Sequence, residues 1–163
     1  MKKALIYLLF IPVLFLTSCG EDEENTPDFR AESIGTYSYS ALLTSTDDRN
    51  NTQTITGTIN VAQSGNQIRM VLDPGADEVP LTTSIVREAS NGYVFDVNTV
   101  TLTDSEGDDF DVRGINSARF NNIDYHGRYD SGANQITVEL LVDYQDNQFD
   151  VFNYEIELIA TKQ

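Results

Sequence analysis

The stretch that decides the fold is QITVELLVDY, residues 135–144. Apolar residues occupy every second position, and the positions between them are polar except for Leu141: Ile136, Val138, Leu140 and Val142 alternate with Thr137, Glu139 and Asp143. This period of two is typical of an antiparallel strand with one buried face and one solvated face. The segment SGAN, residues 131–134, precedes it and suits a tight reversal. The sequence therefore predicts a strand that is entered through a hairpin turn.

The same alternation extends over most of the chain after the first thirty or so residues. We expect strands at 34–43, 53–62, 67–72, 81–88, 92–101, 109–114, 122–130, 135–144 and 149–161. Turn sequences separate several of these runs, at 64–66, 90–92 and 104–107. No helical stripe is evident in this region, and only 115–121 has room for a single helical turn. The pattern predicts an all-β domain over residues 33–163.

Eight or nine hairpin-linked strands in one domain allow two architectures. A closed up-and-down barrel removes exposed strand edges, whereas a sandwich divides the strands between two sheets. The simple hairpin connections favour a single antiparallel up-and-down β-barrel. The chain has no Trp and only one Cys, so it also lacks the Trp and disulfide that are usual in immunoglobulin domains.

The first nineteen residues predict a destination in the cell envelope. Two lysines at positions 2 and 3 precede ALIYLLFIPVLFL, residues 4–16, which is shorter than the roughly twenty apolar residues of a spanning helix. A basic start followed by a short apolar run is typical of a secretory signal. Leu16-Thr17-Ser18-Cys19 resembles the lipobox of bacterial lipoproteins. The resemblance implies that residues 1–18 are removed and that Cys19 carries acyl chains that anchor the protein in a membrane.

An acid-rich segment follows the cysteine and reads GEDEEN at residues 20–25. Such a composition does not bury enough surface to fold alone, so we expect residues 19–32 to act as a lipidated, flexible tether. The acidic run also resembles the surface-export signal of Bacteroidota lipoproteins, which implies an outer-membrane lipoprotein at the cell surface. The alternative is a spacer that holds the domain at the periplasmic face.

The charge balance excludes one class of partner. All 26 acids follow Cys19, and removal of the signal leaves eight basic residues, so the formal charge of the mature chain is −18. A surface of this sign repels phosphate backbones, so we expect no nucleic-acid partner. No second Cys is present in residues 20–163, which leaves no intrachain disulfide to stabilise the domain.

A second resemblance begins at the first expected strand. Ile34-Gly35-Thr36-Tyr37 is similar to the G-x-W start of lipocalins, with Tyr37 in the Trp position. Together with the following short strands and a closing amphipathic strand at 153–162, it resembles the lipocalin-like, or calycin, domains of Bacteroidota lipoproteins. The resemblance implies that Gly35 and Tyr37 close one barrel end. It also implies that a basic residue, for which Lys162 is the candidate, covers the aromatic ring.

The expected interior is rich in aromatic side chains that suit either a ligand cavity or a packed core. An eight-stranded barrel is just wide enough to be filled or to hold one small ligand. One hypothesis is therefore a non-catalytic module that binds a small apolar or glycan-derived ligand. The alternative is a filled barrel that docks another envelope protein. The candidate ligand-binding residues are Tyr39, Tyr93, Phe95, Tyr125, Tyr129, Phe152 and Tyr154.

No arrangement of residues indicates an enzyme, a cofactor or a metal. His126 is the only histidine, and Asp124 and Arg128 at i−2 and i+2 predict a surface ion pair rather than a catalytic base. The acidic stretch Asp104 to Asp111 surrounds a glycine turn, a composition that can bind Ca²⁺. It lacks the EF-hand spacing, so we expect a solvated hairpin tip there.

Overall fold

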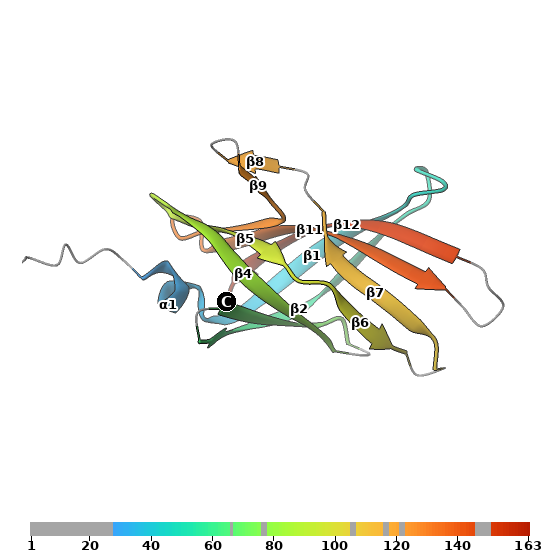
Figure 1. Cartoon of the computed structure of the whole chain (residues 1–163), viewed down its shortest axis with the longest axis horizontal. Coiled ribbons are helices and arrows are strands. Elements are labelled where there is room, and N and C mark those ends of the chain that lie inside the picture. The colour runs from blue at the N-terminus through green and yellow to red at the C-terminus, as the bar shows by residue number, and fades with distance from the viewer. Residues whose placement is uncertain are drawn as a thin grey trace, which may run out of the picture.

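The computed structural model describes residues 28–65, 67–75, 78–104, 107–115, 118–120, 123–145 and 151–163. In these residues it contains one short helix and twelve strands (Figure 1). Their bounds are α1 (Phe29–Ser33), β1 (Gly35–Ser45), β2 (Thr52–Ser64), β3 (Gln67–Asp73), β4 (Val79–Ala89), β5 (Gly92–Val97), β6 (Val100–Thr103), β7 (Asp109–Gly114), β8 (Ala118–Phe120), β9 (Ile123–Tyr125), β10 (Gly127–Asp130), β11 (Gln135–Gln145) and β12 (Val151–Lys162).

Eight of the strands form a closed ring. The order of neighbours is β10-β5-β4-β3-β2-β1-β12-β11, and a further pairing of β10 with β11 closes the circle. Every pairing in the ring is antiparallel. The predicted up-and-down barrel is therefore confirmed. The fold is consistent with a lipocalin-like barrel, and the sandwich alternative is excluded.

The place beside β11 in the barrel wall is shared by two strands, β10 and β7. The first residues of β11, 135–138, pair with β10, and residues 140–144 of the same edge pair with β7. β7 in turn pairs with β6. The chain leaves the wall between β7 and β10 and forms a separate two-stranded ladder, β8-β9. The wall is thus completed by β10 towards one end of the barrel and by β7 and β6 towards the other.

This arrangement corrects three expectations from the sequence. The strand expected at 92–101 ends at Val97 and resumes as β6, and the strand expected at 122–130 is interrupted at His126. The helical turn considered for 115–121 does not form at 118–120, which are strand β8. The physical reason at 118–120 is that the backbone groups bond to a neighbouring strand, since β8 pairs with β9 along its whole length.

The core lies inside the ring and is built from the alternating residues of each strand. In β11 the inward set Ile136, Val138 and Leu140 is almost fully buried, as the period of two predicts. Thr83 is a buried polar member of this interior, and its hydroxyl donates a hydrogen bond to the Ile68 carbonyl at 3.0 Å. Burial of its polar atom is compensated in this way.

Helix α1 covers one end of the barrel, which we call the closed end (Figure 1). Asp28 caps the helix by accepting a hydrogen bond from the Arg30 backbone N–H at 3.1 Å. The Tyr37 hydroxyl donates to the Ser33 carbonyl at 2.7 Å, and the Lys162 ammonium donates to the Glu32 carbonyl at 2.7 Å. Residues 29–32, which the sequence analysis assigned to the tether, are therefore part of this helix.

The Gly35 and Tyr37 pair lies at this closed end, next to Lys162. Gly35 has a φ of +144°, and a side chain there would meet the aliphatic part of Lys162. Tyr37 is the direct strand partner of Lys162 and is fully buried. The glycine is therefore needed both for its backbone conformation and for the close approach of the lysine.

An aromatic cluster fills the interior next to α1. The ring centroids of Tyr93 and Tyr129 are 5.4 Å apart, and those of Tyr93 and Phe95 are 6.0 Å apart. The Tyr93 hydroxyl donates to the Ser33 hydroxyl oxygen at 2.7 Å. Burial raises the pKa of Tyr93 to about 12, so its hydroxyl stays protonated and continues to donate. This half of the barrel is packed.

Candidate functional site

The other end of the interior contains an apolar cavity. Its volume is about 90 Å³. Ala41 lies between its strand partners Ile55 and Leu158, and all three line the cavity. The small side chain of Ala41 leaves space at this point of the wall. The described residues that line the cavity are Tyr39, Ala41, Ile55, Leu72, Pro74, Val79, Phe110, Val112, Leu140, Val142, Ile156 and Leu158. Except for the Tyr39 hydroxyl, these side chains offer only apolar surface.

A wider hollow, which we call the basin, adjoins the cavity. It has a volume of about 470 Å³ and is lined by Asp104, Phe110, Val142, Tyr144 and Tyr154. Phe110 and Val142 line both spaces. The strand register builds this junction, because Phe110 of β7 faces Tyr144 of β11, and Val142 of β11 faces Tyr154 of β12. We call this the open end of the barrel.

The edge of the basin is acidic and hydroxylic. The Tyr144 hydroxyl lies 3.3 Å from Asp104 Oδ2 and 3.2 Å from Asp108 Oδ2. Desolvation, followed by the hydrogen bond to Asp108 and the charge of Asp104, raises the pKa of Tyr144 to about 12. The phenol therefore remains neutral and donates its single hydrogen to one or the other of these carboxylates.

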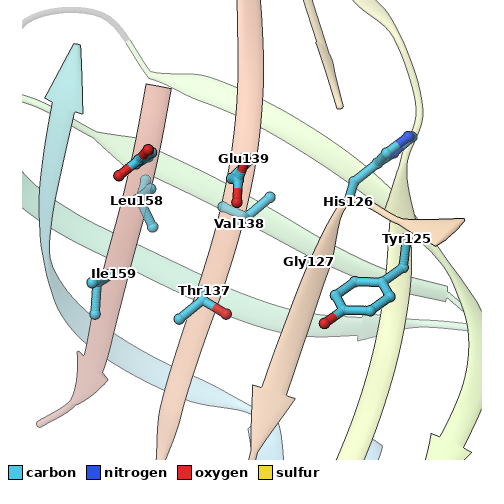
Figure 2. A pocket seen from close by; sticks show the side chains of 9 residues that line it. Tyr125, His126, Gly127, Thr137, Val138, Glu139, Leu158 and Ile159 are labelled. Carbon is cyan, nitrogen blue, oxygen red and sulfur yellow. The ribbon is translucent and has the colours of Figure 1, made fainter. Parts of the chain in front are cut away.

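A third hollow, the outer groove, lies on the outside of the barrel (Figure 2). Its volume is about 220 Å³, and its lining residues are Tyr125, His126, Gly127, Thr137, Val138, Glu139, Glu157, Leu158 and Ile159. Glu139 and Glu157 are direct strand partners with the same charge. Ile159 beside them is 52% exposed. The groove combines an unfavourable like-charge pair with exposed apolar surface.

His126 lines this groove and is held by hydrogen bonds to the neighbouring strands. Its Nδ1 accepts a hydrogen bond from the Val97 backbone N–H at 2.9 Å. Its own backbone N–H donates to the Phe95 carbonyl, and its carbonyl accepts from the Glu139 N–H. Arg128 forms its ion pair with Asp130 at 2.9 Å. The kink between β9 and β10 turns the imidazole towards β5, which sequence spacing alone does not reveal.

The role of His126 leads to a stability prediction. His126→Ala is expected to lower the free energy of unfolding by about 1–3 kcal/mol, because the Val97 N–H loses its acceptor. His126→Asn is the matched control, since its Oδ1 is attached at the position of Nδ1 and can accept the same bond. Urea unfolding followed by circular dichroism measures both variants. Equal losses in Ala and Asn would show that the hydrogen bond is not what stabilises this junction.

The sequence-predicted ligand residues are distributed over several places. Tyr93, Phe95 and Tyr129 belong to the packed closed end, where each is at most 1% exposed. Tyr39 borders the cavity, Tyr154 lines the basin and Tyr125 lines the outer groove. The side chain of Phe152 and the whole of Cys19 lie outside the described residues.

Two aromatic residues of the basin, Phe110 and Tyr144, were missed by the sequence reasoning. Tyr144 has the same parity as Ile136, Val138, Leu140 and Val142, which was a signal that it faces inward. Phe110 likewise alternates with its polar neighbours in the short strand β7. The parity of these two positions was therefore sufficient to add both to the candidate set.

The described residues contain no cluster of three or more His, Cys, Asp or Glu side chains placed to hold a metal ion. Within Asp104–Asp111, Asp109 and Asp111 accept hydrogen bonds from Thr103 and Thr101 at 2.7 and 2.6 Å. Asp104 instead closes the β6–β7 turn, since its Oδ1 accepts from the Asp108 N–H at 2.9 Å. In the part of the chain that the structure describes, no helix is both long and apolar enough to span a membrane.

The fold and its hollows define a class of protein: a closed eight-stranded antiparallel barrel, consistent with a lipocalin-like fold, with one packed end and one open end. No family model and no curated protein matches the chain. The functional assignment therefore depends on the residues and geometry of the site.

Proposed function

We propose that this chain is a cell-envelope lipoprotein whose barrel binds a small apolar ligand at its open end without catalysing a reaction. The observation that carries the proposal is the apolar cavity that adjoins the basin, with Phe110 and Val142 lining both. Concave, mostly apolar sites with a few polar groups at one side are the usual form of small-molecule sites. An eight-stranded barrel has room for one such ligand.

The volumes limit the ligand. The cavity of about 90 Å³ is smaller than the engineered cavity of roughly 150 Å³ that admits benzene. It therefore suits a short alkyl or branched group rather than an aromatic ring, and the rest of the molecule occupies the basin. The apolar lining favours a hydrocarbon group over the sugar rings of a glycan-derived ligand, whose hydroxyls would lose hydrogen bonds to water.

In this proposal the lipid anchor is attached at the end of the barrel opposite the ligand site. The lipobox-like residues 16–19 place the acyl chains on Cys19, before the described chain. The described chain enters the barrel through α1 at the closed end. Attachment is thus at the closed end, and the open end is the one remote from it. We propose an outer-membrane location, at the cell surface or otherwise at the periplasmic face.

Native mass spectrometry tests the binding proposal. The chain starting at Gly20 keeps every residue of α1 and the barrel, and we expect it to carry a non-covalent small molecule or to acquire one from a panel of short alkyl compounds. Ala41→Leu is the matched variant, because it fills the cavity from within, and it should lose the adduct. Repeated isolation of an empty barrel that acquires nothing from the panel would overturn the proposal.

A second candidate function is docking of another envelope protein on the outer wall. Its support is the apolar exposure of Leu42 and Ile159, 40% and 52%, on the paired strands β1 and β12 next to the outer groove. A photo-crosslinking residue at position 159 would then capture one defined partner in cells. The same residue at Val86, which is 37% exposed on β4, is the control and should capture none.

A further inference from the structure

The basin carries a carboxylate and tyrosine side chains, which a site for a purely apolar ligand does not need. It lies directly next to the cavity, and its edge holds the Asp104 carboxylate together with the aromatic side chains of Tyr144 and Tyr154. Among the described residues that line the cavity and basin there is no Lys, Arg or His. A ligand whose apolar group lay in the cavity would therefore have its head group beside this edge of the basin.

The surrounding charges keep this edge negative. Asp108 adds a second carboxylate oxygen 3.2 Å from the Tyr144 hydroxyl. Arg49 and Arg113 are described near this end of the barrel, and each is paired with an acid: Arg49 with Glu155 at 2.6 Å and Arg113 with Asp143 at 3.1 Å. They compensate other carboxylates, and the whole chain has a formal charge of −16. An anionic head group would be repelled here.

The chemistry of the cluster suits a donor with several hydrogens. Tyr144 has one hydroxyl hydrogen, and both Asp104 Oδ2 and Asp108 Oδ2 lie within hydrogen-bonding distance of it. That hydrogen serves one carboxylate at a time, whereas an ammonium group brings three donors. Each carboxylate accepts up to about four hydrogen bonds, so an ammonium and the Tyr144 hydroxyl can share these acceptors. The aromatic faces offer cation–π contact as well.

We infer that the ligand is a cationic amphiphile, with a short apolar group in the cavity and an ammonium head in the basin against Asp104 and Tyr144. This inference rests on the proposed function and specifies its ligand class. It distinguishes this barrel from a carrier of fatty acids, because the carboxylate of a fatty acid would face Asp104 in the same position.

Three probes of equal chain length separate the head group from the tail. Octylamine, octanol and octanoate are titrated into the chain starting at Gly20 at neutral pH and near-physiological salt, and binding is measured by calorimetry. We expect octylammonium to bind about tenfold more tightly than octanol, as a charged hydrogen bond provides. Octanoate should bind most weakly. If octanoate binds best, or all three bind equally, the inference is overturned while the proposed function stands.

A matched pair of double variants assigns the preference to residues. Asp104→Asn with Asp108→Asn should reduce the preference for amine over alcohol to near unity and leave octanol affinity unchanged. Asp109→Asn with Asp111→Asn removes the same charge from the neighbouring Thr-bonded carboxylates and should keep the tenfold preference. A preference lost equally in both pairs would show that only the overall charge matters and would overturn the inference.

Two further outcomes keep the test decisive. If none of the three probes binds the unaltered protein, the proposed function itself fails. If the Asp104/Asp108 double variant does not fold, Asp104→Asn alone replaces it and should lower the amine preference to about threefold, half of the tenfold effect in free energy. An unchanged preference in that folded single variant would contradict the assignment of the head group to Asp104.

Discussion

Phe95→Ala is expected to lower the free energy of unfolding by about 3–5 kcal/mol, the usual cost of truncating a buried phenylalanine. Phe95 has no exposed surface. Its ring occupies the space next to Gly127, so a side chain at residue 127 would collide with it. Urea unfolding of the chain starting at Gly20 measures the loss, and the midpoint should fall without a change in the slope.

Ile159→Ala is the matched control for Phe95→Ala. Ile159 is 52% exposed on the outer wall, so its truncation should change stability by less than about 0.5 kcal/mol. A loss of less than about 1 kcal/mol for Phe95→Ala would contradict the packing described for the closed end. It would favour the sequence-based hypothesis that Phe95 lines a ligand cavity.

Cys19→Ala is expected to abolish lipid attachment, which is the second large effect. In the wild type, metabolic labelling with an alkyne fatty acid should mark the protein, and the protein should fractionate with membranes. The variant should be unlabelled, because its side chain has no sulfur to modify, and it should lose firm membrane attachment. Intact-mass measurement of the purified protein gives an independent reading of the acyl chains.

Ser18→Ala controls for disturbance of the cleavage site. It keeps a small residue directly before the cysteine, so labelling and membrane association should persist. A Cys19→Ala protein that stayed labelled and as firmly bound as the wild type would overturn the lipoprotein part of the proposal. The barrel and its ligand site would be unaffected by that result.

The alternation of apolar residues predicted the barrel because each strand has one face inside a closed ring. What it did not predict was the shared wall position of β7 and β10. That feature depends on the break at His126, where the imidazole bonds to the Val97 N–H across the sheet. A contact of this kind depends on tertiary pairing and leaves no periodic trace in the local sequence.

The candidate site, like the fold, was predictable only in part from the sequence. Parity placed Tyr39 and Tyr154 towards the interior, but it did not show which end of the interior is filled. Whether an end is filled depends on the size of the side chains that meet across the barrel. The rings of Tyr93 and Tyr129 pack against each other beside α1, whereas the small Ala41 lies at the cavity. Tyr125 is in the outer groove because the break at His126 interrupts the alternation between it and Tyr129.

The most direct test of the central claim is an octanol titration followed by backbone amide chemical shifts, because this uncharged probe reports the binding place independently of head-group preference. The largest shifts are expected at Phe110, Val142 and Tyr154, where the cavity meets the basin. Tyr93 in the packed closed end should hardly move. Shifts concentrated around Ile159 in the outer groove, or saturable shifts around Tyr93, would contradict a ligand site at the open end.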